Sequence, residues 1–240
     1  MLLLLAAFAG LVRGYSGFGF AMILALGMLG SRAPSEVIPT VLLLDLVGSA
    51  SLWLRALRDS HHRLTLRLTA GLLCAVPIGV LALARVPSAW LAPGIAMVCL
   101  FGGMMVLRQS PAPVTEAAVP LRSAFWAGLG AGLATVLASA GGPPLMLYLL
   151  RCGLTPRALR ATAIMFFALS SALALLVMGL FDVVGRTHVQ LAATLLLPAL
   201  AGNLLGQWLQ PRWQPLPLHR LVGVLLVLFS AVLLYRTLAG

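Results

Sequence analysis

Apolar runs separated by short polar segments occupy most of the chain. Most of these runs are close to the roughly 20 residues that a helix needs to cross the hydrocarbon core of a bilayer. They lie at 1–12, 14–30, 37–54, 68–84, 86–107, 124–150, 161–181, 191–209 and 218–235. The pattern predicts an all-α membrane protein in which the polar segments form the loops between helices.

Composition and charge favour this class and exclude others. The 240 residues are 61% hydrophobic and 9% charged, which is far more apolar than a soluble domain. The net charge of +11 comes from arginines that mostly lie between apolar runs, so we interpret it as a topology signal and expect no nucleic-acid partner. The three cysteines are scattered, and we recognise no metal, cofactor or catalytic motif. We therefore expect a lipid bilayer around the chain, no cofactor and no enzymatic activity.

Two glycine-dense stretches interrupt the apolar runs. They are 14–20, with the sequence GYSGFGF, and 139–144, with the sequence SAGGPP. Glycine holds a helix poorly and proline lacks a backbone donor, so each stretch frees peptide groups at membrane depth. Such backbone is tolerated only inside protein or beside a water-filled cavity. Two breaks at corresponding places in two halves of a chain predict a transport site.

Weak internal similarity indicates a duplication, because matching residues keep their order while their offset changes slowly. The pairs are Gly19 and Gly141, Pro34 and Pro156, and Thr40 and Thr162 at an offset of 122, Pro77 and Pro198 at 121, and Phe101 and Phe229 with Arg108 and Arg236 at 128. We predict two repeats, 1–115 and 116–240, within one integral-membrane domain. The apolar start of the chain matches part of the second half, so we do not expect a cleaved signal peptide.

The distribution of arginine favours an inverted arrangement of these repeats. If each broken segment enters and leaves the membrane on one side, eleven arginines lie on one side of the bilayer and four on the other. If each broken segment crosses once, the division is eight against seven. The positive-inside rule favours the first division. We predict two inverted repeats, each a broken or re-entrant helical hairpin plus three transmembrane helices. The alternative is eight transmembrane helices in two four-helix repeats.

The two breaks also predict an anion-binding site. A half-helix that begins after Gly19 and another that begins after Gly142 would direct unpaired N–H groups at a common point near the midplane. Proline suits the first turn of the second half-helix, where no N–H is needed. The alternative is that the glycines only permit close helix packing. The predicted substrate-binding residues are Arg13, Gly17, Phe18, Gly19, Phe20, Gly141, Gly142, Pro143 and Asn203.

Two charged residues lie within the apolar runs or at their edge, where charge is costly and usually functional or paired. Arg13 approaches the tip of the first hairpin, and we predict that it contacts the anion; the alternatives are an interfacial position or a structural ion pair. Asp45 lies in the middle of a run, and a buried carboxyl takes up a proton readily, so we predict a proton-coupling role. The alternative for Asp45 is a fixed pair with an arginine. Weaker polar candidates on the spans are Ser49, Ser51, Thr162, Ser170 and Ser171.

The two glycine stretches also carry a family resemblance. The glycines of 14–20, with Phe18 and Phe20 between them, and the GGPP of 141–144 resemble the duplicated motif of the sulfite exporter family TauE/SafE, which comprises prokaryotic integral-membrane proteins. The resemblance covers nearly the whole chain. It implies an exporter of sulfur-containing anions, such as sulfite or sulfonates, driven by an ion gradient. The two phenylalanines depart from the family's usual triple glycine and favour a larger or more apolar anion.

The sequence therefore predicts a secondary transporter, expected to be an exporter, of a small anion across the prokaryotic cytoplasmic membrane. The expected substrate is a sulfur-containing oxyanion or an organosulfonate. Two alternatives are an anion channel with the same architecture and a non-transporting membrane scaffold. A homodimer is one oligomeric state that the sequence allows.

Overall fold

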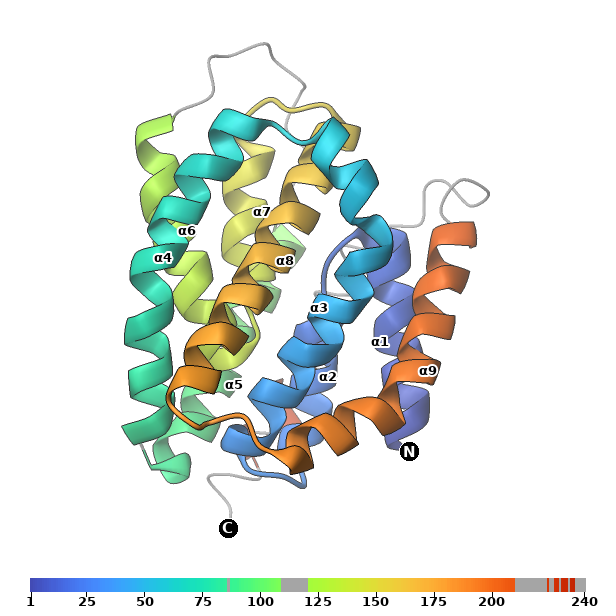
Figure 1. Ribbon diagram of the computed structural model, residues 1–240, viewed down its shortest axis with the longest axis vertical. Helices are drawn as coiled ribbons and strands as arrows, with labels where there is room; N and C mark the ends of the chain where they lie inside the picture. Colours follow the sequence, from blue (N-terminus) through green and yellow to red (C-terminus); the bar gives the residue numbers. More distant parts are fainter. Residues whose placement is uncertain are drawn as a thin grey trace.

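The computed structural model is all-helical throughout the residues that it describes, which are 1–85, 87–108, 121–209 and single positions within 224–235. The helices are α1 (Leu2–Ser16), α2 (Phe20–Leu29), α3 (Pro34–Asp59), α4 (His62–Arg85), α5 (Ser88–Arg108), α6 (Leu121–Ala138), α7 (Gly142–Leu150), α8 (Pro156–Leu180) and α9 (Arg186–Leu209) (Figure 1). The predicted repeat boundary at 115 and 116, most of the run 218–235, and the matches Phe229 and Arg236 lie outside the described residues.

The first glycine stretch separates two short antiparallel helices. Helix α1 ends at Gly17 with φ 86°, and α2 begins after Gly19 with φ 92°. Both angles are left-handed, a conformation that glycine adopts without steric cost. The side chain of Leu5 near the start of α1 lies against Gly27 near the end of α2. The outer ends of both helices therefore lie together, at the lower end of the molecule in Figure 1.

The second stretch has the same local form but the opposite direction. Helix α6 ends before Ser139, whose φ of 50° is left-handed although the residue is not glycine. Helix α7 begins at Gly142 with proline in its first turn, as the sequence predicts. The side chains of Ser123, near the start of α6, and Tyr148, near the end of α7, form a hydrogen bond. The outer ends of this pair lie at the upper end of Figure 1.

Three described helices are long and apolar enough to cross a membrane, namely α4 over His62–Leu83, α8 and α9. A fourth is added if α3 counts as one span, because its segments Pro34–Ala50 and Leu52–Asp59 are bent by 61°. Prolines inside α3, α4, α5 and α9 do not end these helices. In membranes, neighbouring helices can satisfy the backbone groups that a proline frees.

Helices from the two halves of the chain pack in exchanged pairs. Helix α1 lies along α9, α6 lies along α4, and α3 packs against α8. Glycines set the closest contacts, since a Cβ added at Gly14 or Gly206 would overlap the backbone of the opposite helix in the α1 and α9 pair. The same is true of Gly71 and Gly128 in the α4 and α6 pair. Small residues that let backbones approach are the usual way in which helices associate in membranes.

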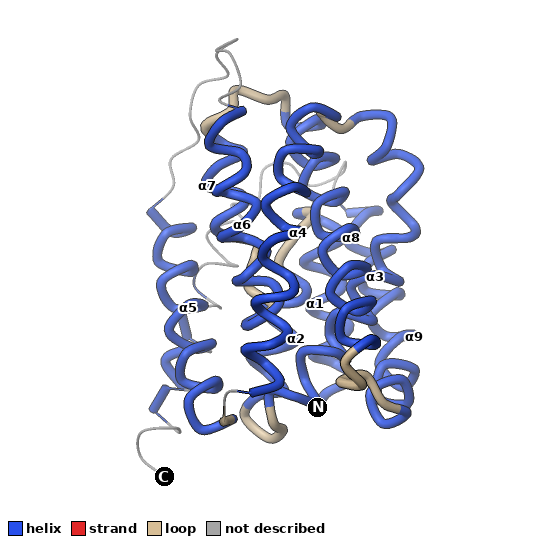
Figure 2. Tube along the Cα trace, turned by 60° about the vertical axis from the view of Figure 1, so that its left-hand side comes forward, coloured by secondary structure: helices blue, strands red, loops and turns tan. Residues whose placement is uncertain are grey.

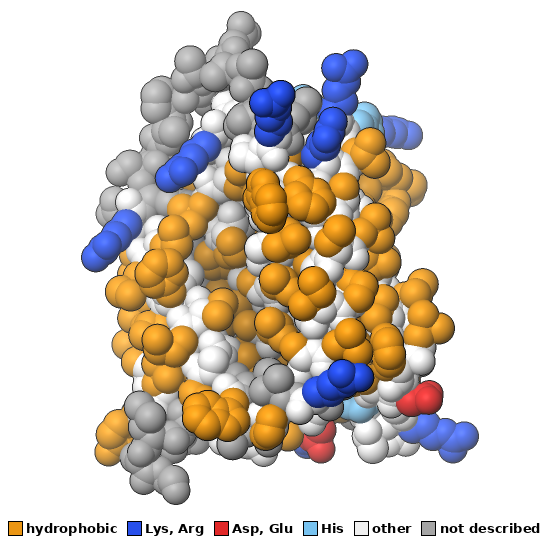
Figure 3. All heavy atoms as spheres, turned by 90° about the vertical axis from the view of Figure 1, so that its left-hand side faces the viewer, with side chains coloured by type: hydrophobic (Ala, Val, Ile, Leu, Met, Phe, Trp, Pro, Cys, Tyr) orange, Lys and Arg blue, Asp and Glu red, His pale blue; other side chains and the backbone are white. Residues whose placement is uncertain are grey.

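Side-chain chemistry separates the middle of the molecule from its ends. Large apolar side chains are exposed on the outer helices, such as Leu66, Trp126 and Leu197. They cover the face shown in Figure 3, whereas most arginines on that face lie toward its two ends. Most of α2 is buried, and it lies inside the bundle (Figure 2). An apolar band between charged ends is the surface that a bilayer requires.

Candidate functional site

The two breaks meet in the interior and enclose a small cavity. A Cβ added at Gly142 would lie 3.4 Å from the ring of Phe18, so the tips of the two hairpins are in contact. The described residues that line the cavity are Arg13, Gly17, Phe18, Gly19, Phe20, Ala21, Met22, Asp45, Thr135, Ser139, Gly141, Gly142 and Phe167. The fold thus brings together both hairpin tips and the middle of α3 and α8.

Two helix N-termini face this cavity. The first N–H groups of a helix have no acceptor within it. The N-cap residues of α2 and α7 are Gly19 and Gly141, and no described side chain caps either helix. In α7 the prolines Pro143 and Pro144 have no N–H, so Gly141 and Gly142 supply the donors. Aligned peptide dipoles give each N-terminus a partial positive charge. The cavity is therefore suited to an anion.

The opposite ends of the neighbouring helices are already neutralised. A guanidinium nitrogen of Arg160, Nη2, donates to the carbonyl oxygen of Gly14 at 2.7 Å, near the C-terminus of α1. The backbone N–H groups of Ser139 and Ala140 donate to carbonyl oxygens in the last turn of α6, at 2.8 and 2.9 Å. These contacts reduce the negative potential of the two C-termini. The positive potential of α2 and α7 therefore dominates at the cavity.

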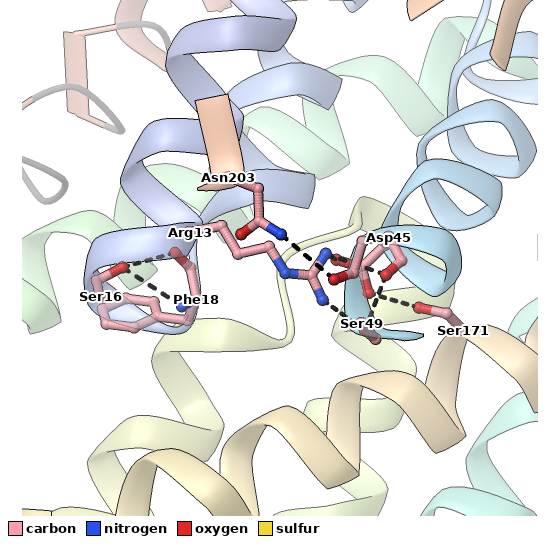
Figure 4. A network of polar contacts seen from close by, with 8 residues as sticks. Arg13, Ser16, Phe18, Asp45, Ser49, Ser171 and Asn203 are labelled. Atoms are coloured by element: carbon pink, nitrogen blue, oxygen red, sulfur yellow. Dashed lines mark hydrogen bonds and ion pairs between the residues drawn. The ribbon is translucent and has the colours of Figure 1, made fainter. Parts of the chain in front are cut away.

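Arg13 and Asp45 form a buried ion pair at the edge of the cavity (Figure 4). Arg13 Nη1 donates to Asp45 Oδ1 at 2.7 Å and to its carbonyl oxygen at 3.0 Å, and Arg13 Nη2 donates to the hydroxyl of Ser49. The guanidinium carbon also lies 5.7 Å from the centre of the Phe20 ring. Arg13 is 3% exposed and Asp45 is 6% exposed, so neither charge is solvated by bulk water. The ion pair that the sequence offered as an alternative is therefore present.

The second carboxylate oxygen of Asp45 links the two halves of the chain. Ser171 on α8 donates its hydroxyl to Asp45 Oδ2 at 2.7 Å. Asp45 thus contacts α1 through one oxygen and α8 through the other. Movement of α1 or α8 away from α3 would therefore break a hydrogen bond to this carboxylate.

Ser139 adds a hydroxyl that the surrounding protein does not use. Its side chain is 2% exposed, lines the cavity, and has no hydrogen-bond partner among the described residues. A buried polar group without a partner costs free energy unless a ligand or water satisfies it. The left-handed backbone of Ser139 is a further local cost that a glycine would avoid. The hydroxyl is therefore available to a ligand in the cavity.

Two predicted binding residues lie outside the cavity. Pro143 packs toward Gly102 of α5. Asn203 borders a neighbouring space that shares Arg13 and Phe20 with the cavity, and its Nδ2 donates to the Gly48 carbonyl oxygen at 3.4 Å. Among the weaker candidates, Ser49 and Ser171 form hydrogen bonds in the Arg13 and Asp45 network. Thr162 accepts a hydrogen bond from the His61 N–H at 3.1 Å. Ser170 is buried without a partner among the described residues, and the side chain of Ser51 is not described.

The sequence analysis missed several residues that line or support the site. Thr135 and Phe167 line the cavity, and Arg160 supports the hairpin tip through Gly14. The offset of 122 pointed to two of them, because Thr135 corresponds to Arg13 and Phe167 corresponds to Asp45. No sequence signal distinguished Arg160 from the other arginines near helix ends.

An apolar helical bundle with two broken helices around a buried polar cavity defines a membrane-embedded protein of the transporter class. The family model of the sulfite exporter TauE/SafE matches residues 2–233, so this chain belongs to that family. The suspected resemblance is thereby confirmed, and with it the assignment to membrane transport. No curated protein and no solved structure matches the chain.

Proposed function

We propose that this protein is a secondary transporter that binds a small anion in the cavity between the two hairpin tips. The observation that carries the proposal is the convergence on one buried space of two helix N-termini and the Ser139 hydroxyl, which has no partner among the described residues. Backbone N–H groups can only donate hydrogen bonds, and the Ser139 hydroxyl can donate one as well, so this set of groups favours an anionic oxygen. A cation in the same space would face the positive ends of two helix dipoles and the Arg13 guanidinium.

Arg13 supplies a full positive charge at the edge of this site. While Arg13 is paired with Asp45, the two charges nearly cancel at a distance, and the helix dipoles provide the positive potential in the cavity. An anion that enters the cavity competes with Asp45 for the guanidinium. Charge-assisted hydrogen bonds of this kind contribute about 1.5–3 kcal/mol each, so binding at Arg13 is strong enough to change its partner.

Asp45 is the proposed site of proton coupling. Once an anion takes over Arg13, the carboxylate is left in a buried place without its main counter-charge, and a proton on Asp45 would keep the buried charges balanced. Ser171 remains as a hydrogen-bond partner for the neutral acid, because a hydroxyl can accept as well as donate. Substrate binding and proton binding would then occur together, which links the anion to a proton gradient.

We infer that the two halves are inverted repeats related by the offset of 122. Five pairs of cavity residues are separated by this number, namely Arg13 and Thr135, Gly17 and Ser139, Gly19 and Gly141, Phe20 and Gly142, and Asp45 and Phe167. Helices α3 and α8 begin at Pro34 and Pro156, which are also 122 apart. The opposite directions of the two hairpins and the exchanged packing pairs support the same relationship.

The distribution of arginine supports a cytoplasmic position for one end of the molecule. The link from α3 to α4, the link from α7 to α8 and the start of α6 lie at the upper end of Figure 1. These links and the helix ends beside them contain Arg58, Arg63, Arg122, Arg151 and Arg157. The lower end holds Arg32, Arg85 and Arg186. By the positive-inside rule the upper end faces the cytoplasm of a prokaryotic cell.

The cavity is small. Its volume of about 20 Å³ holds roughly one water molecule, which is too little for an oxyanion with three oxygens. Helices must therefore separate when substrate binds. We propose that the halves rock against each other where α3 crosses α8, since this contact lies beside the cavity and contains the Asp45 and Ser171 bond. Phe18, Phe20 and Phe167 give the walls an apolar part, which suits an organosulfonate as well as sulfite.

Flux into proteoliposomes tests the function. Purified protein should take up sulfite and an alkyl sulfonate with saturable kinetics, and an imposed proton gradient should raise the initial rate. The matched variants are Gly142→Ala, which places a methyl group beside Phe18 at the hairpin contact, and Gly179→Ala, which has open space at the added carbon. Loss of flux in the first variant alone supports the site. Flux that never saturates would indicate a channel. The absence of flux through the wild type and both variants would indicate a scaffold.

A further inference from the structure

A second, larger cavity lies between the cytoplasmic ends of α3 and α8 and the end of α9. Its volume is about 430 Å³, and we call it the vestibule. The described residues that line it are Leu52, Ala56, Asp59, Pro156, Arg157, Arg160, Ala161, Ile164 and Gln207. It has room for an organic anion with its hydration water, unlike the much smaller cavity between the hairpin tips.

The polar groups of the vestibule favour an anion. Arg157 Nε donates to Asp59 Oδ2 at 2.8 Å in an exposed pair, so these two charges largely cancel. Arg160 lies deeper, one helical turn further along α8, so the described lining of the vestibule holds two arginines and one carboxylate. Gln207 adds an amide nitrogen that is buried and has no hydrogen-bond partner among the described residues. The N-terminus of α8, which begins at Pro156, adds its partial positive charge.

Arg160 also forms the wall between the vestibule and the hairpin tip. Its Nη2 holds the Gly14 carbonyl oxygen, and a Cβ added at Gly17 would lie 2.9 Å from its Cγ. Gly17 itself lines the small cavity between the hairpin tips. One side chain therefore touches the vestibule on one side and the glycine break on the other. An anion that draws the guanidinium away from Gly14 removes a contact that holds the tip of the first hairpin.

We propose that the vestibule is a loading site for the substrate anion on the cytoplasmic side, and that Arg160 is the residue that binds the anion there and releases the hairpin tip. This proposal rests on the proposed function, because it assumes that the same anion continues to the small cavity between the hairpin tips. The polar donors and the apolar wall from Leu52 to Ile164 match a sulfonate that carries a short organic group.

Transport kinetics test the role of Arg160. Arg160→Gln should raise the KM for sulfite presented at the cytoplasmic face by about tenfold, the lower end of what a charge-assisted bond contributes, while the KM at the opposite face changes little. Arg160→Lys keeps the charge and should recover part of the loss. Arg151→Gln removes a charge from the same end but not from the vestibule, so its KM should equal that of the wild type. Equal KM values for all variants at the cytoplasmic face would overturn the proposal.

Cysteine accessibility tests the vestibule without relying on transport. In a background in which Cys74, Cys99 and Cys152 are replaced by alanine, Ala161→Cys places a thiol on the vestibule wall. Methanesulfonate, which unlike sulfite does not react with thiol reagents, should slow its modification by a small thiol reagent in neutral-lipid vesicles, whereas modification of Arg186→Cys at the opposite end should be unaffected. No protection would overturn the proposal, as would protection by an anionic lipid alone, which would assign the vestibule to a headgroup. Protection without flux would retain the vestibule and reject the transporter.

Discussion

The buried pair of Arg13 and Asp45 gives the sharpest test of the energetics of the site. In Asp45→Ala, Arg13 keeps the Asp45 main-chain carbonyl and Ser49 as partners but loses its counter-charge at 3% exposure. Removing one partner of a buried pair typically costs about 3–5 kcal/mol, because the remaining charge has no compensation. Asp45→Asn keeps the acceptor oxygen and the side-chain shape. Its expected cost is smaller, about 1–3 kcal/mol, the range for a buried group that loses part of its hydrogen bonding.

A double variant isolates the cause of this loss. Arg13→Met with Asp45→Ala removes both charges, so most of the stability lost in Asp45→Ala should return. The measurement is unfolding of purified protein in mixed micelles by titration with a denaturing detergent, with fluorescence-detected chromatography as a check of homogeneity. All variants that remove Arg13 or Asp45 should lose proton-driven flux, including the stable ones. A double variant no more stable than Asp45→Ala would refute the uncompensated-charge reasoning.

Three further predictions concern the backbone and the free hydroxyl. Gly14→Ala should lower the apparent melting temperature strongly, because its Cβ would overlap the Asn203 carbonyl, whereas Gly94→Ala has open space and should not; equal melting of the two would contradict the close α1 and α9 packing. Gly19→Ala should destabilise by about 1–2 kcal/mol through its left-handed φ of 92°, which detergent titration measures; an unchanged midpoint would argue against that backbone. Ser139→Ala should raise the KM for sulfite about tenfold with little change in melting, since the hydroxyl has no described partner to lose; an unaltered KM would remove it from the site.

Much of the helical pattern followed from the sequence because lipid leaves few choices. A chain that lies in hydrocarbon must satisfy its backbone within helices, so apolar runs predict helices and glycine or proline clusters predict where they break. Gly17 and Gly19 take left-handed angles, and Pro34, Pro143 and Pro156 occupy first turns. Each of these features depends on a few adjacent residues. Local chemistry was therefore enough to predict it.

The partners of polar residues did not follow from the sequence in the same way. Asp45 was predicted to couple protons or to pair with an arginine, and only the fold shows that α1 brings Arg13 to it while α8 brings Ser171. Gly14 belongs to the first glycine stretch, yet it serves close packing against α9 and does not line the cavity. Such roles depend on which helices lie side by side across the two halves.

The sequence by itself determined a membrane-embedded helical chain with two breaks and a repeating register, because hydrophobicity and backbone chemistry act over a few neighbouring residues. Only the tertiary structure decided that the breaks touch, that the cavity between them is small, and that Arg160 connects the first hairpin tip to the vestibule. These facts depend on contacts between residues more than a hundred positions apart, such as Arg160 and Gly14. Their geometry is fixed by the packing of whole helices, which no local pattern encodes.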